Sequence, residues 1–488
     1  MPLASRPSSL VLLLLAAPAL AGDPPSFTGV GDLTGGTVLS ACTGVSGDGS
    51  VACGYSNSAG GDRAFRWTAA GGIEDLGDLP GGIAYSQANA VSADGTAIVG
   101  YSTSASGGEA FRWTAAGMQG LGDLPGNAFF SIANGVNADG SVVVGHSESA
   151  LSGTLSAEGF RWTAATGIQP LGDLPGSIFF SVATGCSADG STACGYGTST
   201  ASGAASSEAA RWTAATGMVG LGDLPGGGFG GNAFGISADG HVIVGLSAAT
   251  AGVLAFRWAD PATGGAGIAS IGDIPGGSVY SRANGVSADG SVIIGQSIGP
   301  NGMEAFVWTA TTGCVSLKGL LESLGLDLTG WTLEVGTAVS ADGRTIVGYG
   351  PNPSGNYEGW VAFLGDPWTN LGGGLVGTAG VPVLAGHGPL LEGHPASLEL
   401  TGALPSGTAT LVIGLSVLNA PFKGGTMVPD TDVLVPGLPL DASGAITLGA
   451  TWPAGVPSGF GTWYQAWIAD AAGPKGFAAS NGVVGVAP

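Results

Sequence analysis

The chain has 488 residues, including 94 Gly and 28 Pro, and it is 44% hydrophobic but only 9% charged. The hydrophobic content excludes a disordered chain, and the many Gly and Pro are typical of short strands joined by tight turns. The formal net charge of −22 argues against nucleic acid or an anionic membrane surface as a partner, because both would repel the protein.

The N-terminus has the pattern of a secretory signal peptide. Arg6 is the only charge before the apolar run at 10–17, which is too short to span a bilayer, and Ala19-Leu20-Ala21 is a small-x-small cleavage site. We therefore expect residues 1–21 to be removed. The mature protein is expected to be secreted, extracellular or at the cell surface, without a membrane span.

One hairpin pattern recurs along the chain. An apolar run enters a Ser-Ala-Asp-Gly turn, and an alternating run of β-branched residues leaves it, which predicts a β-hairpin. The turn occurs seven times, at Asp48, Asp94, Asp139, Asp189, Asp239, Asp289 and Asp342. Seven copies indicate a repeat protein.

Each repeat also has a Gly-Asp-Leu segment, expected to be a strand, before the hairpin, and a strand ending in Trp after it. Four strands in about 50 residues are typical of a propeller blade, so we predict a seven-bladed β-propeller over 27–366. The strand from Phe27 has no earlier blade to join and should complete the seventh. That blade's unit is degenerate, with its first strand expected at 317–320.

Charges recur in pairs. An Arg stands before the Trp of five units, and an Asp of the next Gly-Asp-Leu follows it; in the sixth unit Val307 and Gly319 replace both. When two charged residues are replaced together, an ion pair across adjacent strands is indicated, since a single buried charge left without its partner is costly. We predict five structural pairs: Arg66 with Asp78, Arg112 with Asp123, Arg161 with Asp173, Arg211 with Asp223 and Arg257 with Asp273.

Four of the five Cys flank hairpin turns. Cys42 with Cys53 and Cys186 with Cys194 are candidate cross-strand disulfides in an oxidising compartment. The two pairs are offset differently about their turns, which argues against a shared register. Cys314 is expected to be a buried, small apolar residue.

No residue cluster indicates a reaction. The Asp-Gly turns supply positive φ, and their acidic spacing does not converge as calcium ligands do. We predict no catalytic residue, no metal site and no cofactor. His146 and His241 are interpreted as drift at tolerant positions. The most promising binding residues are aromatic rings in the linkers that enter the hairpins, where they could stack on sugar faces or pack between blades: Tyr85, Phe130, Phe180 and Tyr280.

After Asp366 the repeat ends. Short apolar runs separated by Gly and Pro continue to the C-terminus, and they predict a β-sandwich-like domain over 367–488.

The repeated unit, with Gly-Asp-Leu, Ser-Ala-Asp-Gly and Phe-Arg-Trp in order, resembles the extracellular HAF repeat over 27–363. Its strand order is similar to that of kelch propellers, although their double Gly is absent. The C-terminal region is similar to a β-rich domain of secreted planctomycete and myxobacterial proteins, through Gly424-Gly425-Thr426, Pro429, Gln465 and Ser480-Asn481. These resemblances imply export and a propeller-like fold, and no activity.

The sequence favours a non-enzymatic binding scaffold, expected to be a monomer, whose partner is a glycan or an exported protein. The alternative is a propeller enzyme acting on carbohydrate, a polysaccharide lyase or a glycoside hydrolase. An enzyme should place non-repeating charged side chains at the channel mouth, whereas a scaffold should place polar or aromatic residues of low charge there. A third interpretation makes the C-terminal domain a sorting tag with the propeller as its cargo.

Overall fold

The computed structural model describes residues 24–126, 128–153, 156–176, 178–203, 206–310, 312–388, 390, 395–457 and 459–487. The predicted signal peptide at 1–21 lies outside the described residues. The chain divides into two compact units, one at Pro25–Gly365 and a second that begins at Asp366. None of the helices in the described part has the length and apolar character needed to cross a membrane.

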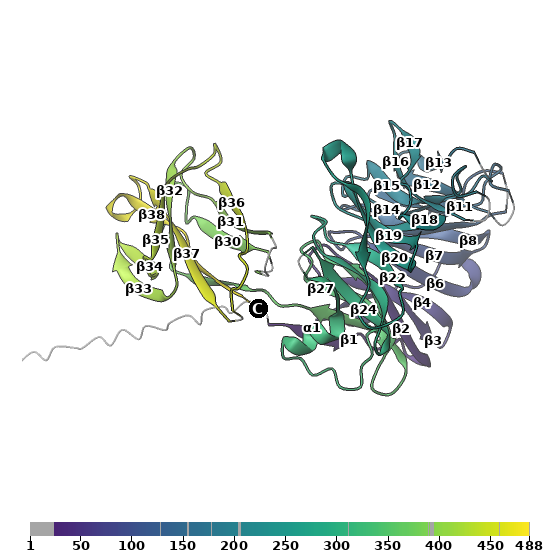
Figure 1. Ribbon diagram of the computed structural model, residues 1–488, viewed down its shortest axis with the longest axis horizontal. Helices are drawn as coiled ribbons and strands as arrows, with labels where there is room; N and C mark the ends of the chain where they lie inside the picture. The colour runs from purple at the N-terminus through teal and green to yellow at the C-terminus, as the bar shows by residue number, and fades with distance from the viewer. Residues whose placement is uncertain are drawn as a thin grey trace, which may run out of the picture. The chain divides into compact units, whose positions relative to one another are not determined.

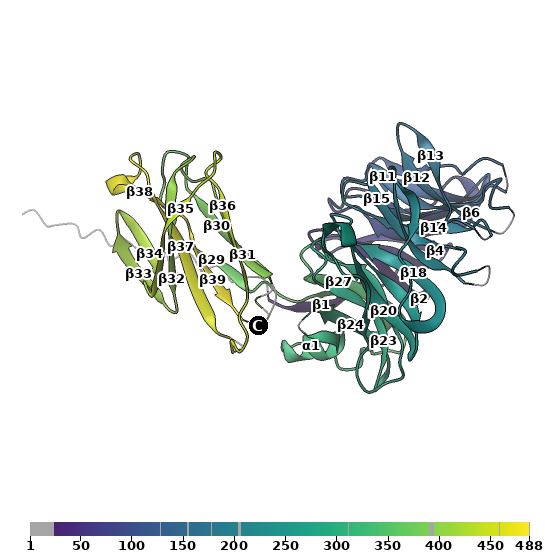
Figure 2. The same ribbon diagram turned by 45° about the horizontal axis from the view of Figure 1, so that its top comes forward.

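The first unit is the predicted seven-bladed β-propeller, built from seven four-stranded antiparallel sheets (Figures 1 and 2). The first four blades are β2 (Gly35–Val45), β3 (Ala52–Ser58), β4 (Gly61–Thr68), β5 (Gly72–Asp75); β6 (Gly81–Val91), β7 (Ile98–Ser104), β8 (Gly107–Thr114), β9 (Gly117–Gly120); β10 (Ser131–Val136), β11 (Val142–Ser147), β12 (Glu158–Thr163), β13 (Gly167–Gly172); and β14 (Ser181–Cys186), β15 (Thr192–Gly197), β16 (Glu208–Thr213), β17 (Gly217–Gly220). The last three are β18 (Gly226–Ile236), β19 (Val242–Ala249), β20 (Gly252–Ala259), β21 (Gly267–Gly272); β22 (Ser281–Val286), β23 (Ile293–Gly299), β24 (Gly302–Thr309), β25 (Gly313–Ser316); and β26 (Val335–Val339), β27 (Thr345–Pro351), β28 (Tyr357–Phe363), β1 (Ser26–Gly29).

The N-terminal strand completes the last blade. β1 pairs antiparallel with β28, with Ser26 opposite Phe363 and Gly29 opposite Trp360. The predicted closure is therefore confirmed. The pairing covers an edge of β28 that would otherwise expose unpaired backbone groups.

The Ser-Ala-Asp-Gly turns have a second use beyond reversing the chain. Backbone N–H groups of each turn donate to a carbonyl of the next turn around the propeller, as from Ala188 to Ala238 at 2.9 Å and from Ala238 to Ala288 at 3.0 Å. Seven such hydrogen bonds form a closed ring, in which the N–H of Ala341 in the seventh blade donates to the carbonyl of Gly47 in the first. Small residues at this position let seven turns meet closely enough to bond.

The Gly-Asp-Leu segments are connections between blades, not the strands we expected. The outer strand β5 ends at Asp75, so Gly77, Asp78 and Leu79 follow it. The Gly77 carbonyl accepts from Ser86 Oγ at 2.6 Å, and the Leu79 N–H donates to Ser102 Oγ at 3.0 Å. The segment thus fastens one blade to the first two strands of the next.

Residues 317–320, expected to be a strand, lie in the helix α1 (Leu317–Ser323). Ser316 caps its N-terminus, because its side chain accepts from the Gly319 N–H. Leu317 and Leu321 are buried one turn apart on a single face. A helix therefore replaces a strand where the repeat degenerates.

The predicted ladder of Arg–Asp pairs is wrong. None of the five pairs is an ion pair among the described residues; Asp78 pairs instead with Arg63, at 2.7 Å, and Arg211 with Asp260, at 3.8 Å. The Arg side chains reach toward the next blade's turn, where Nε of Arg112 donates to the Gly140 carbonyl at 2.8 Å. Nε of Arg161 and of Arg257 donates in the same way to Gly190 and Gly290. The guanidinium and the carboxylate of each unit thus make different contacts between blades. The remaining residues of the predicted pairs form none of the predicted ion pairs: Arg66, Asp123, Asp173, Asp223 and Asp273.

The candidate disulfides are also wrong, since all five Cys are free thiols. In the first blade Cys42 lies opposite Gly54 and Cys53 opposite Gly44, with a β-bulge between. The two side chains consequently pack into different hydrophobic clusters. In the fourth blade Cys194 lies opposite Gly185 and Cys186 opposite Ala193, so these two Cys are not cross-strand partners either, and they pack in different clusters. Cys314 is buried as expected.

The second unit has two main sheets around one core. The larger contains β29 (Trp368–Gly372), β39 (Gly482–Val486), β37 (Gly461–Ala469), β32 (Thr408–Gly414), β35 (Val433–Pro439) and β38 (Phe477–Ala479). The smaller contains β30 (Val383–His387), β31 (Pro395–Thr401) and β36 (Ile446–Thr451), and a hairpin joins β33 (Val417–Phe422) to β34 (Gly425–Pro429). Buried side chains from both sheets form the core, as in the predicted sandwich.

A buried amide organises this unit. Gln465 has no exposed surface, and its Oε1 accepts from the Val428 N–H at 3.0 Å and from Trp467 Nε1 at 3.1 Å. Its Nε2 donates to the carbonyls of Thr426, at 3.1 Å, and Ser480, at 3.0 Å. Thr426, Gln465 and Ser480, three of the residues that carry the resemblance in this region, therefore belong to one structural network.

Candidate functional site

The linker aromatics lie at one end of the propeller's first strands. Each first strand begins at the linker and ends at the Ser-Ala-Asp-Gly turn, so the rings and the turn ring lie at opposite ends. The four predicted binding residues are all partly exposed there: Tyr85, Phe130, Phe180 and Tyr280.

The linker rings pack against aromatic rings of the second strands. Tyr101 contacts Tyr85, with centroids 5.8 Å apart, and also Phe130, at 5.9 Å. Phe130 contacts the His146 ring at 6.3 Å. These ring contacts connect one blade to the next, so Tyr85 and Phe130 pack between blades, as in the second of the two interpretations given above. His146 is thus a member of the aromatic packing.

The fourth blade has a cavity beside such a pair. Phe180 and Tyr196 have centroids 6.1 Å apart, and both line a cavity of about 440 Å³ together with Ile178. The other lining residues all carry hydroxyl groups: Ser156, Thr198, Ser206 and Ser207. Aromatic walls with a few hydroxyl groups are the chemistry that suits a sugar ring, which has both apolar C–H faces and polar edges.

Local hydrogen bonds hold these walls. Asp173 accepts from the Leu174 N–H at 2.8 Å and from the Phe180 N–H at 3.1 Å, so a Gly-Asp-Leu carboxylate fixes the linker that carries Phe180. Burial raises the pKa of Asp173. On the other side, the Ser207 hydroxyl donates to the Asn232 side chain in the fifth blade.

Beyond Tyr196 the repeat symmetry breaks. In six blades a Thr or Asn at the first-strand β-bulge donates to the next blade's backbone; Asn134, for example, donates from Nδ2 to the Ala183 carbonyl at 2.8 Å, and Thr184 from Oγ1 to the Ala233 carbonyl at 3.0 Å. The fifth blade has Phe234 at this position. Its ring contacts Tyr196, with centroids 6.5 Å apart.

Arg282 stacks on Phe234. Its Cζ lies 3.9 Å from the Phe234 ring centroid, a cation–π geometry. Arg282 is on β22, and no other Lys, Arg, Asp or Glu occurs on the first strands of the seven blades. The site therefore consists of the cavity, the Tyr196 and Phe234 rings, and one cation.

Besides Arg282, the charged group next to the cavity walls is the Asp173 carboxylate, which accepts from the Phe180 N–H. Burial raises the pKa of Tyr196, and it lowers the pKa of His146 to about 4. No carboxylate, His or Cys is among the described residues that line the cavity. Within the described ranges, no group of three or more His, Cys, Asp or Glu could hold a metal ion.

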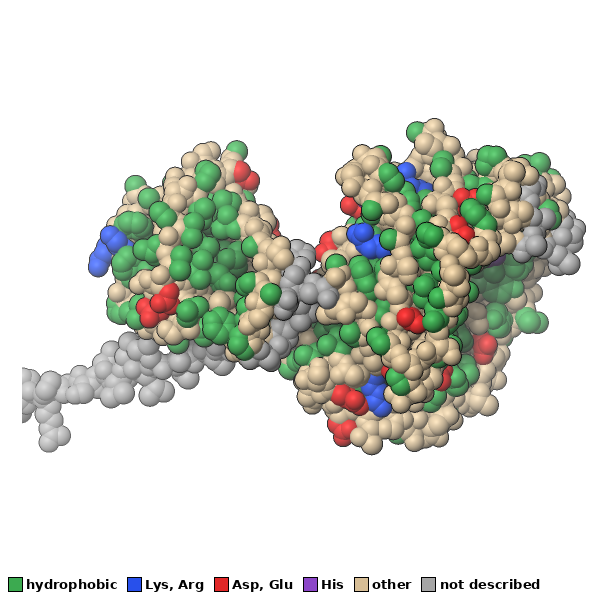
Figure 3. Space-filling model, in the orientation of Figure 1, with side chains coloured by type: hydrophobic (Ala, Val, Ile, Leu, Met, Phe, Trp, Pro, Cys, Tyr) green, Lys and Arg blue, Asp and Glu red, His purple; other side chains and the backbone are tan. Residues whose placement is uncertain are grey.

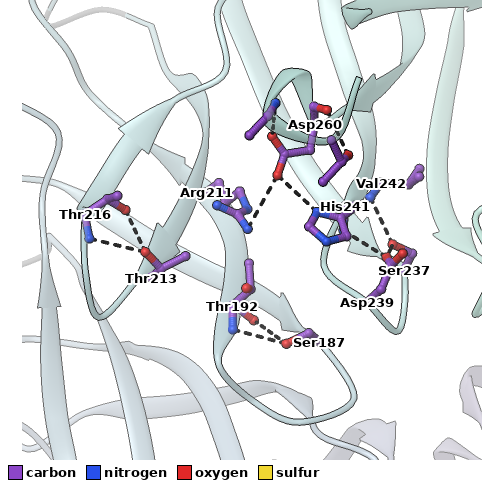
Figure 4. A network of polar contacts seen from close by, with 12 residues as sticks. Ser187, Thr192, Arg211, Thr213, Thr216, Ser237, Asp239, His241, Val242 and Asp260 are labelled. Carbon is purple, nitrogen blue, oxygen red and sulfur yellow. Dashed lines mark hydrogen bonds and ion pairs between the residues drawn. The ribbon is translucent and has the colours of Figure 1, made fainter. Parts of the chain in front are cut away.

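A second polar cluster lies near the turns of the fourth and fifth blades (Figure 4). His241 Nδ1 lies 3.1 Å from Asp260 Oδ2, and Arg211 lies 3.8 Å from the same oxygen. Asp260 also caps the short helix η1 (Pro261–Thr263) by accepting from the Ala262 N–H. No hydroxyl or thiol of the described residues bonds to the His241 ring, so the cluster joins two blades and lacks a nucleophile. His241 thus has a specific partner, contrary to the interpretation as drift.

The sequence prediction identified part of this site. Phe180 lines the cavity, and Tyr280 is two residues from Arg282, whereas Tyr85 and Phe130 lie in the other run of rings. Tyr196, Phe234 and Arg282 were missed. The signal that could have found the last two is their departure from the repeat, because Phe234 stands where other blades have Thr or Asn.

Comparison with known proteins gives only distant likenesses. No family model matches the sequence, and no curated protein matches it. Among solved structures, an oligogalacturonate lyase from Vibrio parahaemolyticus is 11% identical, over 70% of this chain and 98% of that chain, with a TM-score of 0.46. The Dos1 propeller is 9% identical, over 71% of this chain and 95% of that chain, with a TM-score of 0.37. TolB from Acinetobacter baumannii is 14% identical with a TM-score of 0.32, over 44% of this chain, which spans only 50% of that protein. The fold rests on the strand pairings of this chain itself.

Proposed function

We propose that this protein is an exported, non-enzymatic scaffold that binds a glycan at the fourth blade of its propeller. The observation that carries the proposal is the cavity in which Phe180 and Tyr196 stand beside four hydroxyl side chains. Aromatic rings can stack on the C–H face of a pyranose, and Ser and Thr hydroxyls both donate and accept hydrogen bonds to its edge.

Low charge favours binding over catalysis. Most glycoside hydrolases use a pair of carboxyl groups that flank the scissile bond, whereas the described cavity lining and the first strands contain none. Arg282 is the single charged group on the first strands. Charged side chains are also few and scattered on the propeller face seen in Figure 3. Export and membership of the HAF repeat class are part of the proposal and rest on the sequence alone.

The test is retention of the purified full chain on a panel of polysaccharides, with assay of newly formed chain ends. We expect retention without new ends. Phe180→Ala and Tyr196→Ala should each weaken binding about tenfold, which corresponds to about 1.4 kcal/mol. Tyr55→Ala is the matched control, since Tyr55 occupies the same repeat position in the first blade.

Two outcomes would contradict the proposal. New chain ends would indicate the carbohydrate-active enzyme instead. Equal losses in Tyr55→Ala and Tyr196→Ala would show that the fourth-blade cavity is not the binding site. Thermal unfolding of each variant separates loss of binding from loss of fold.

A further inference from the structure

Arg282 is an unpaired cation in a strongly acidic protein. The chain has 34 Asp and Glu against 12 Lys and Arg, yet no ion pair or hydrogen bond involves the Arg282 side chain within the described residues. Its Nε–H is buried and meets no acceptor in that part of the chain. A half-buried guanidinium without a counter-ion is costly to hold. Of its three nitrogens only Nε is both buried and, among the described residues, unpaired, so the two Nη groups are the donors that an acceptor from outside the chain would meet.

The surroundings of Arg282 do not neutralise it. Its nearest electrostatic neighbours are the phenols of Tyr280, Tyr349 and Tyr196, which carry no charge near neutral pH. Burial lowers the pKa of Arg282 from its ordinary value, and these phenols act in the opposite direction. An arginine remains protonated under these conditions.

The Phe234 ring fixes the orientation of the guanidinium. Because Arg282 stacks on one face of this ring at 3.9 Å, the plane of its donors is held rather than free to rotate. Phe234 in turn contacts Tyr196, which lines the cavity. The cavity, the two rings and the cation are therefore consecutive neighbours.

From this arrangement we propose that Arg282 is the recognition residue for a carboxylate on the bound glycan, so that the ligand is a polymer of uronic acid. Arginine presents paired N–H donors that match the two oxygens of a carboxylate. A uronate ring has a C–H face that can stack on Phe180 and Tyr196. Its carboxylate carries the negative charge that could pair with Arg282. This inference rests on the proposed glycan binding and specifies its substrate class.

The experiment compares two polymers that differ at one group, which is a carboxylate in the first and its uncharged methyl ester in the second. Polygalacturonate and its fully methyl-esterified form are titrated into the purified full chain near neutral pH at an ionic strength of about 0.15 M, where salt screens the repulsion between a polyanion and the net charge of −22. We expect the wild type to bind the acid at least tenfold more tightly than the ester. Arg282→Gln should abolish this preference, because binding of the acid should fall to the level of the ester in the same variant, and Arg282→Lys should restore only part of the preference.

Arg257→Gln is the matched control. Arg257 is partly buried like Arg282, but its Nε donates to the Gly290 carbonyl away from the site, so the preference for the acid should persist. Thermal unfolding of all variants shows which of them fold. If Arg282→Gln does not fold, the Arg282→Lys variant carries the test, because it keeps the charge and loses the paired donors.

The failure of each proposal is distinguishable. Binding of both polymers with equal affinity would overturn the carboxylate inference and leave glycan binding intact, as would an unchanged preference in Arg282→Gln. Equal affinity for sulfated dextran and polygalacturonate would overturn the assignment to a carboxylate. Absence of binding to every polymer tested would overturn the proposed function itself.

Discussion

The backbone N–H of Ala341 donates to the carbonyl of Gly47 at 2.9 Å and so joins the seventh blade to the first. This is the last of seven similar bonds between neighbouring turns. The repeated Ser-Ala-Asp-Gly sequence therefore does more than form hairpins, since it also bonds each blade to the next.

Gly290, in the turn of the sixth blade, cannot accept a side chain. Its φ is +75°, and a Cβ there would lie 2.6 Å from Val242 Cγ2 in the fifth blade. Gly290→Ala should therefore lose about 1–2 kcal/mol of unfolding free energy from the backbone conformation and about 1–3 kcal/mol more from the contact. Chemical denaturation measures the sum.

Gly217→Ala is the control for the Gly290 variant. Gly217 also has a positive φ, of +64°, but a Cβ would meet nothing within 4 Å. Gly217→Ala should therefore lose only the unfolding free energy that comes from the strained backbone conformation. Equal losses in the two variants would contradict the close approach of neighbouring blades at the turn ring.

His146 should make the protein lose stability in mildly acidic solution. Burial lowers its pKa to about 4 in the folded chain, against about 6.5 in an unfolded one. The unfolded state therefore binds the proton first, so stability is complete above pH 6.5 and falls as the pH approaches 4. The loss is roughly 3 kcal/mol at about 1.4 kcal/mol per pH unit.

The measurement is the free energy of unfolding of wild type and His146→Tyr between pH 7 and 4. Tyr occupies this position in the second and fourth blades, so the replacement fits the repeat. The variant should show a shallower decline. A decline as steep in His146→Tyr as in wild type would refute the prediction.

The cysteines should be unreactive in the folded protein and free when it unfolds. Burial raises the pKa of Cys53, Cys186 and Cys314 to about 12, and that of Cys194 to about 11. The thiolate is the reactive form. A chromogenic thiol reagent at pH 8 should detect less than one thiol per native chain and all five in denaturant without reductant. Detection of a single thiol after unfolding would mean that two disulfides exist.

Gln465 should be essential to the C-terminal unit. Gln465→Ala removes the acceptor of the Val428 N–H and of Trp467 Nε1, and each buried donor left unpaired costs about 1–3 kcal/mol. We expect a loss of about 2–4 kcal/mol in the unfolding of this unit, followed by tryptophan fluorescence. Asn370→Ala, an exposed amide in the same sheet, should cost less than about 1 kcal/mol. Similar effects of the two changes would speak against the buried network.

The periodic parts of the fold could be predicted because the turn chemistry is local. Asp48 and its six equivalents mark the hairpins, and the unmatched strand from Phe27 implied the closure onto β28. The Arg–Asp ladder failed because joint loss of two charges does not reveal where they point. Asp173 holds the linker of Phe180, while Arg161 reaches the next blade's turn.

The site was harder to predict for a related reason. Ser156, Thr198 and Ser207 are brought together by loops of two blades, and no sequence pattern links them. Arg282 could have been recognised as a charge that breaks the repeat on the first strands. The aromatic rings drew attention to the correct end of the strands, but only Phe180 among the predicted residues lines the cavity.

The pairing of β1 with β28 also dictates an order of events as the chain is made. The first described strand has no partner until the last blade has been synthesised, because the two are separated by more than three hundred residues, as the contact between Gly31 and Glu358 shows. Contacts at such separation form late in folding. A chain terminated within the seventh blade would leave two open strand edges at once, and such edges recruit other chains.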